Sequence, residues 1–127
     1  MILLDSNILI YTLHRAPNAL AYMKSLSETP YISVLSVMEL YHGVSEEYDA
    51  IKTAVLLEKC EIINVNHSIA KRAGEFLSAM RRRGKKTHRK EDMLIAATAL
   101  SLDATLVTAN WKDFQHIAGL KVEKFVL

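Results

Sequence analysis

Short apolar segments alternate along this chain with segments whose apolar residues recur at helical spacing, and this alternation restricts the folds that the chain can adopt. Residues 2–4 are apolar without an alternating polar position, which is typical of a strand buried on both faces. Ala19, Met23 and Leu26 instead follow one another at intervals of four and three residues, as on one face of a helix. Strands that alternate with helices indicate a parallel sheet covered by helices.

The same alternation continues to the end of the chain. Four further segments have the composition of strands: 31–35, 61–65, 104–108 and 121–126. Five segments have helical spacing or helix-boundary signals: 18–26, 37–42, 46–59, 66–83 and 92–102. Asn66 can cap the fourth of these helices, and Gly84 can end it. We therefore predict an α/β fold, a three-layer α/β/α sandwich around a mainly parallel sheet of about five strands.

The length of the chain is that of one domain. It has 127 residues, half of them apolar, so we expect a single domain over residues 1–127. Asp5 interrupts the apolar start before it reaches the length of a signal peptide, and no apolar run is long enough to span a membrane, so we expect a cytoplasmic protein. Cys60 is the only cysteine, which excludes an internal disulfide and a cysteine-based zinc cluster.

Acidic and amide side chains lie where the functional edge of such a sheet is expected. Asp5 directly follows the first predicted strand, and Asn110 and Asp113 follow the fourth. Glu39 and Asp92 lie near the amino ends of two predicted helices. Because ligands of open parallel sheets bind beyond the carboxyl ends of the strands, we expect these side chains to converge there.

Converging carboxylates raise one another's pKa unless a cation neutralises them. Ligands that offer only oxygen atoms suit Mg²⁺ or Mn²⁺, and the lack of a paired His or Cys set disfavours zinc. A divalent ion held by a few acids suits phosphodiester hydrolysis, because it activates water and neutralises charge on the phosphate. The sequence leaves open whether one or two ions would be used.

Each acid also has a purely structural interpretation. Asp5 can cap the helix that follows it, and Asp92 can cap its own helix. Ser36 and Glu39 have the spacing of a capping box. Asp113 can be a solvated turn residue. Residue type and position alone do not separate these interpretations from a catalytic role.

Basic residues are concentrated just before Asp92. Residues 81–90 contain seven of the sixteen Lys and Arg residues and no acid, whereas the rest of the chain has more acids than bases. Such a segment can contact a nucleic-acid backbone, although solvated Lys and Arg also favour a helix C-terminus. Within this segment we expect four residues to bind RNA: Arg82, Arg83, Lys85 and Lys86.

Four motifs together resemble the PIN-domain family, in particular the VapC-type toxins of toxin–antitoxin pairs. MILLDSNILI (residues 1–10) resembles the apolar strand with the first acid, followed by a hydroxyl residue and Asn7. ISVLSVMELYHG (residues 32–43) resembles the second motif. EDMLIAATA (residues 91–99) resembles the third, which is the most specific, and VTANWKDF (residues 107–114) resembles the fourth. The resemblance covers nearly the whole chain.

The resemblance implies a PIN-like sandwich that cleaves RNA with Mg²⁺ or Mn²⁺, usually as a homodimer, and that is silenced by a VapB-like antitoxin. It implies that Asp5 and Asp92 are metal ligands and that Glu39 is a ligand or orients the attacking water. The fourth motif contains both Asn110 and Asp113, and the resemblance does not decide which of them would be the fourth metal ligand.

Two further residues, Asn7 and Thr108, would support the site. Glu91 departs from the family pattern, since it adds a charge directly before Asp92. The alternatives are a PIN nuclease of RNA processing or decay, an inactive PIN-like binding module, and a flavodoxin-like domain. The last of these would need a Gly-rich phosphate loop after the first strand, and the chain has no such loop.

Overall fold

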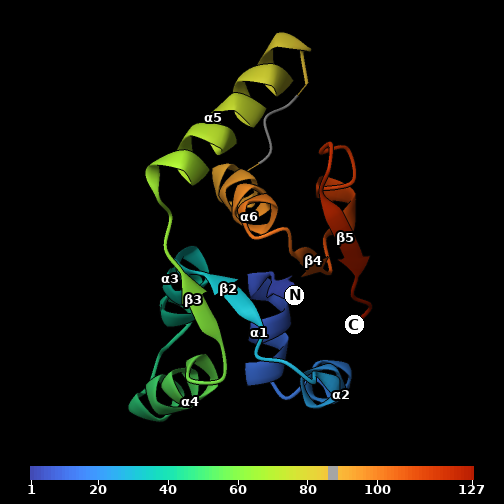
Figure 1. Ribbon diagram of the computed structural model, residues 1–127. Coiled ribbons are helices and arrows are strands. Elements are labelled where there is room, and N and C mark those ends of the chain that lie inside the picture. The colour runs from blue at the N-terminus through green and yellow to red at the C-terminus, as the bar shows by residue number, and fades with distance from the viewer. Residues whose placement is uncertain (86–88) are drawn as a thin grey trace.

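The computed structural model describes residues 1–85 and 89–127, and its strands form one parallel sheet (Figure 1). The order of strands across the sheet is β3-β2-β1-β4-β5, so the first strand is central. All neighbouring strands run parallel, which confirms the predicted α/β class. The strands within the described ranges are β1 (Ile2–Leu4), β2 (Tyr31–Ser33), β3 (Glu61–Ile63), β4 (Thr105–Thr108) and β5 (Lys121–Lys124).

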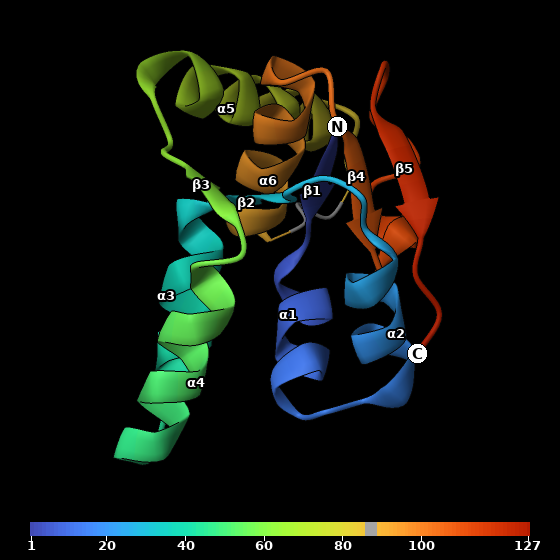
Figure 2. The same cartoon turned by 60° about the horizontal axis from the view of Figure 1, so that its bottom comes forward.

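Helices connect the strands and cover both faces of the sheet. They are α1 (Ser6–Leu13), α2 (Pro17–Ser25), α3 (Val34–His42), α4 (Glu47–Leu57), α5 (His67–Arg82), α6 (Lys90–Ser101) and a short 3₁₀ helix η1 (Trp111–Asp113). Figure 2 shows α5 and α6 on one side of the sheet and α1 to α4 on the other. This arrangement is the predicted three-layer sandwich. None of the described helices is both long and apolar enough to span a membrane.

The central strands are buried on both faces, as their continuous apolar composition predicts. Leu3 and Leu106 pack with the alanine-rich α6 on one face. Leu4 and Val107 pack with α1, α3 and α4 on the other. Each of these four side chains is fully buried, so β1 and β4 form a rigid base for the residues that follow them.

The second strand is shorter than predicted, because α3 begins at Val34 rather than at residue 37. The Ser33 hydroxyl accepts a hydrogen bond of 3.2 Å from the backbone N–H of Leu35 and caps the helix. The β-branched and apolar residues after Ser33 therefore belong to the first turn of a helix. Their composition alone favoured a strand.

The end of α5 follows the sequence prediction. Gly84 has a positive φ of 68°, which is accessible to glycine at low cost. The backbone N–H of Gly84 bonds to the carbonyl of Arg81, and that of Lys85 bonds to the carbonyl of Met80. These two bonds form a Schellman motif, which ends the helix at the predicted glycine.

Strand register brings the functional edge together. Leu4 lies opposite Ile32 of β2 and Val107 of β4. The backbone N–H of Asp5 continues the ladder to the carbonyl of Val107 at 3.0 Å. Asp5 therefore emerges at the carboxyl end of the central strand, between the ends of its two neighbours.

Candidate active site

Asp5 is both a helix cap and the most buried acid of this edge. Its side chain accepts hydrogen bonds of 2.7 Å from the backbone N–H of Ser6 and 2.7 Å from the hydroxyl of Thr108. The residue is only 5% exposed. Burial raises the pKa of the Asp5 carboxyl above its ordinary value, and the hydrogen bonds from Thr108 and Ser6 oppose this shift. The structural and functional interpretations of Asp5 are therefore compatible.

The two residues expected to support the site connect the ends of β1 and β4. The Asn7 side-chain amide donates a bond of 3.4 Å to Oδ2 of Asp5, and its oxygen accepts one of 3.3 Å from the backbone N–H of Ala109. The Thr108 hydroxyl accepts a bond of 3.0 Å from the backbone N–H of Asn110. These contacts hold the Asp5 carboxylate against the loop that follows β4.

Glu39 belongs to the same network, and its capping-box interpretation is wrong. Ser33 caps α3, and Glu39 lies beyond the first turn of that helix. Its carboxylate accepts a bond of 3.1 Å from the hydroxyl of Ser6. The Ser6 hydroxyl also lies 2.9 Å from that of Ser36, which is fully buried. Ser36 therefore supports Ser6 and not the helix end.

Asp92 is the third residue of α6, so the interpretation of Asp92 as an N-cap is also wrong. Arg89 occupies the cap position, without a side-chain cap bond. The pKa of Asp92 is raised to about 6, chiefly by burial and then by the charge of Asp5. The charges of Asp113 and Glu39 raise it further, whereas Arg89 lowers it. The four acids therefore share one electrostatic environment.

The fourth motif contributes two different groups to this edge. Asp113 lies in η1, and its charge raises the pKa of both Asp5 and Asp92. Asn110 is exposed, and its backbone N–H, rather than its side chain, bonds to the Thr108 hydroxyl. Of the two candidates, Asp113 is the one whose charge acts on Asp5 and Asp92.

The donor set fits a hard divalent cation, because it consists of carboxylate and hydroxyl oxygens. Among the described residues, no three acidic, His or Cys side chains form a ready-made metal cluster. Glu91, beside Asp92, is half-buried in the first turn of α6, where an acid favours the helix dipole. It is not among the groups that shift the pKa of Asp92.

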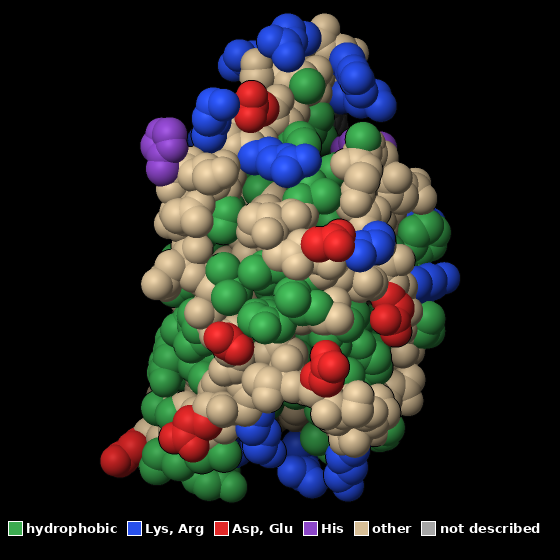
Figure 3. Space-filling model, viewed as in Figure 1, with side chains coloured by type: hydrophobic (Ala, Val, Ile, Leu, Met, Phe, Trp, Pro, Cys, Tyr) green, Lys and Arg blue, Asp and Glu red, His purple; other side chains and the backbone are tan. Residues whose placement is uncertain are grey.

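The described residues of the basic segment lie at the end of α5 and at the start of α6. Basic side chains gather there at the top of the molecule (Figure 3). Arg82, Arg83 and Lys85 are exposed, and Lys86 lies outside the described residues. Within residues 1–85 and 89–127, no ion pair joins the first three residues to the acids. These residues therefore present positive charge to solvent and not to the acidic site.

Among the described residues, Arg89 is the cation that the structure places at the acids. The sequence prediction of RNA contacts covered it only as part of the basic segment 81–90 and did not name it among the four representative residues. Its guanidinium lies 3.8 Å from the Glu39 carboxylate. Its position in the basic segment, three residues before Asp92, was a usable signal, since residues three apart are neighbours at a helix end.

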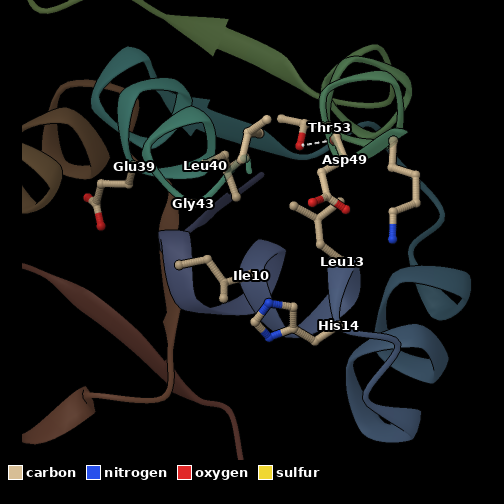
Figure 4. Close-up of a pocket in the computed structure, with 10 residues that line it drawn as sticks. Ile10, Leu13, His14, Glu39, Leu40, Gly43, Asp49 and Thr53 are labelled. Atoms are coloured by element: carbon tan, nitrogen blue, oxygen red, sulfur yellow. Dashed lines mark hydrogen bonds between the residues drawn. The ribbon is translucent and has the colours of Figure 1, made fainter. Parts of the chain in front are cut away.

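A pocket of about 190 Å³ adjoins the acidic site between α1, α3 and α4 (Figure 4). Glu39 lies at one end of the pocket and Asp49 toward the other. Apolar side chains from α1 and α3 line the space between them: Ile10, Leu13 and Leu40. Sequence patterns did not indicate this pocket, because its walls depend on how α1 packs against α3 and α4, and α1 is separated from them in the chain by α2 and β2.

The fold and the acidic edge define a class of protein, and comparison with known proteins identifies it. The PIN domain family model matches residues 2–120, so the chain belongs to the PIN-domain family. Ribonuclease VapC2 of Rickettsia felis is 31% identical, over 97% of this chain and 96% of that protein. Ribonuclease VapC1 of Haemophilus influenzae is 30% identical, over 94% and 93%.

Solved structures agree with these sequence relatives. The VapBC2 complex of Rickettsia felis, bound to a DNA fragment from its promoter, matches with a TM-score of 0.86 and 30% identity. That match covers 99% of this chain and 100% of that one. A toxin–antitoxin complex from Klebsiella pneumoniae matches with a TM-score of 0.83 and 27% identity, over 99% and 98% of the two chains.

Proposed function

We propose that this chain is a VapC-type endoribonuclease, which hydrolyses RNA phosphodiester bonds with Mg²⁺ or Mn²⁺ and is the toxin of a type II toxin–antitoxin pair. One observation carries the proposal: acids of four separate motifs come together beyond the carboxyl end of the central strand, where the charges of Asp5, Asp113 and Glu39 all raise the pKa of Asp92. Relatives named as ribonucleases support RNA as the substrate, including a tRNA(fMet)-specific endonuclease of Shigella flexneri that is 25% identical. The whole chain, residues 1–127, would act as one PIN domain in the cytoplasm.

Three carboxylates would hold the divalent ion: Asp5, Asp92 and Asp113. When bound, such an ion lowers the pKa of water and neutralises charge on the scissile phosphate. The chain itself positions the ligands. Thr108 and Ser6 hold the Asp5 carboxylate in a fixed orientation through two bonds of 2.7 Å. This preorganisation limits the reorganisation that metal binding requires.

Glu39 would orient the attacking water and accept its proton. Its carboxylate is 24% exposed, so it can reach solvent, whereas Asp5 is nearly buried. The Ser6 hydroxyl holds one carboxylate oxygen at 3.1 Å and leaves the other toward Arg89. A carboxylate held in this way can act as a general base within hydrogen-bond reach of water.

The proposed partners are a VapB-like antitoxin and a second copy of the chain. Neighbouring structures that contain toxin–antitoxin complexes support the first partner. Apolar side chains on the outer surfaces of α3 and α4 offer an area that a partner can cover. They are Met38, Tyr41, Tyr48, Ile51 and Val55. The pocket beside Glu39 would let a bound antitoxin segment block the active site.

The decisive experiment compares the wild type with Asp5→Asn. Purified wild-type protein should cleave RNA with Mg²⁺ or Mn²⁺, and chelation should stop the cleavage. Asp5→Asn should fold, because Asn also caps helices, but should not cleave. Cleavage by metal-free wild type in chelator would contradict the mechanism. A wild type that binds RNA without cleaving it under any metal would indicate the inactive binding module.

A growth test addresses the toxin role separately. Induced wild type should arrest growth of a bacterial host, Asp5→Asn should not, and co-expression of the antitoxin encoded beside the gene should restore growth. Active cleavage without growth arrest would instead favour a nuclease of RNA processing or decay.

A further inference from the structure

Arg89 is a cation built into an acidic site. Its guanidinium lies 3.8 Å from the Glu39 carboxylate. Its charge also lowers the pKa of both Asp5 and Asp92, so it acts on acids from three separate elements. The Arg89 side chain is 66% exposed. The residue thus combines proximity to the acids with access to solvent.

Within residues 1–85 and 89–127, Arg89 has an ion pair with Glu39 and no side-chain hydrogen bond. A separation of 3.8 Å from Glu39 is too long for a hydrogen bond, so charge alone holds the guanidinium there. The residue occupies the N-cap position of α6 but makes no side-chain cap bond. A guanidinium has five N–H donors in a planar fork, which matches the oxygens of a phosphate.

A structural role explains Arg89 poorly. Exposed ion pairs add little stability, and this pair lacks the short bidentate geometry that makes some of them effective. An RNA phosphate, by contrast, is repelled by the negative charge at this edge of the sheet. It must approach a site where four acids lie near one another, and a phosphate carries the same sign of charge as a carboxylate.

We propose that Arg89 binds a non-bridging oxygen of the RNA phosphate that is cut and holds this phosphate beside Glu39. In the absence of RNA, Arg89 neutralises Glu39. When RNA binds, the guanidinium turns its free donors to the phosphate and releases the Glu39 carboxylate toward the attacking water. The proposal rests on the proposed function and names one residue that positions its substrate.

The positive charge of Arg89 should affect metal binding and RNA binding in opposite directions. A positive charge beside metal ligands repels a divalent ion, so removing Arg89 should leave metal affinity unchanged or increase it. A positive charge that contacts RNA attracts the phosphate, so removing it should weaken RNA binding. A residue that merely maintains the fold of the site would weaken both when replaced.

The test uses Arg89→Gln and Arg89→Lys, with Arg72→Gln as the matched control. Arg72 is an exposed arginine of α5 whose guanidinium lies over the ring of Phe76. Binding of a fluorescent single-stranded RNA is measured by anisotropy in chelator, where no cleavage occurs, over a range of salt concentrations. Mn²⁺ binding without RNA is measured by calorimetry, and KM and kcat are measured with Mg²⁺.

Arg89→Gln should weaken RNA binding by roughly tenfold, the effect of one charged hydrogen-bonded contact. It should lower the salt slope of binding by about 0.7, the value for one phosphate contact to a single strand. KM should rise more than kcat falls, and Mn²⁺ affinity should not decrease. Arg89→Lys should retain the salt slope, because it retains the charge, but only part of the affinity.

Two outcomes would overturn the inference: RNA affinity and salt slope of Arg89→Gln equal to those of Arg72→Gln, or weakened Mn²⁺ binding in Arg89→Gln. If wild type cleaves RNA and Arg89→Gln matches the control, only this inference fails. If wild type cleaves no RNA with any metal, the proposed function fails, and the binding assay in chelator still reports on Arg89.

Discussion

The hydroxyl of Thr108 donates a hydrogen bond of 2.7 Å to the carboxylate of Asp5, although 103 positions separate the two residues. Both side chains are buried, so neither group can exchange this bond for one to water without cost. The bond lowers the pKa of a carboxyl group that burial otherwise raises. Thr108 therefore helps keep Asp5 charged and fixed in orientation.

Replacing Thr108 with Val should impair the site without changing the shape of the residue. Asp5 loses a charge-assisted hydrogen bond, and the backbone N–H of Asn110 loses its acceptor. We expect a loss of about 1–3 kcal/mol in the free energy of unfolding. RNA cleavage should fall by at least roughly tenfold, because the pKa of Asp5 rises and its orientation is no longer fixed. Denaturant melts and initial cleavage rates check both effects.

Thr108→Ser is the matched control, since it retains the hydroxyl. It should cleave RNA at close to the wild-type rate. Wild-type activity in Thr108→Val would show that the hydrogen bond to Asp5 is dispensable.

Glu39→Gln and Asp92→Asn should each fold normally and lose nearly all RNA cleavage. Neither side chain caps a helix, so neither replacement removes a capping bond. Asp92→Asn also loses a favourable charge in the first turn of α6, which costs little beside the burial of that charge. A neutral amide attracts a divalent ion weakly and cannot accept a proton from water as a carboxylate does. Cleavage is measured under saturating Mg²⁺, with circular dichroism to confirm folding.

Glu91→Gln is the control for Asp92→Asn, because it removes a neighbouring acid that does not shift the pKa of Asp92. It should keep wild-type activity. If Glu39→Gln or Asp92→Asn also cleaves at close to the wild-type rate, that carboxylate does not belong to the catalytic set.

The raised pKa of Asp92 predicts an unusual dependence of metal-free stability on pH. The carboxyl titrates at about 6 in the folded protein and at 3.8 in the reference state. Between these values the folded protein binds more protons than the unfolded chain, so stability falls as pH rises through the window. The loss of stability that comes from ionising Asp92 is absent below about pH 4 and fully present above about pH 6.

Asp92→Asn removes this titration. In chelator, its melting temperature should exceed that of the wild type by a few degrees at pH 7–8, and the difference should vanish near pH 4. Calorimetric melts across this pH range test the prediction. A wild type that gains stability from pH 4 to 7 relative to Asp92→Asn would contradict the sign of the shift. Excess Mg²⁺ should reduce the difference at pH 7, because the ion stabilises the charged carboxylate.

The basic segment at the end of α5 should contribute to RNA affinity through its charge. Replacing Arg82, Arg83, Lys85 and Lys86 with Gln should weaken RNA binding and flatten its dependence on salt, by up to about 0.7 in slope for each phosphate that the segment no longer binds. Binding is measured by anisotropy between low and physiological salt. The control removes the same charge elsewhere on the surface: Lys24, Lys59, Lys71 and Arg72. If both variants have the wild-type slope, the segment serves the antitoxin or faces solvent.

Local sequence patterns determined much of this protein. Apolar runs predicted the five strands, and helical spacing or helix-boundary signals predicted the helices α2 to α6, because a buried face repeats along a helix or strand with that element's own period. No helical spacing was identified for α1. Gly84 predicted the end of α5, since its positive φ depends on the residue itself. The position of Asp5 after a buried strand predicted the functional edge, because parallel strands share the direction in which they end.

The tertiary structure alone decided which side chains meet. Ser6 contacts Glu39 across 33 positions, and Thr108 contacts Asp5 across 103, because strand register and helix packing bring them together. The structure also shows which residues cap helices and which lie in the site. Ser33 caps α3, whereas Glu39 lies further along that helix and contacts Ser6 at the acidic site. Arg89 looked like any other residue of a basic segment until the start of α6 placed it at Glu39. Charge and residue type are local properties, whereas a hydrogen bond or an ion pair depends on distances that only the folded chain sets.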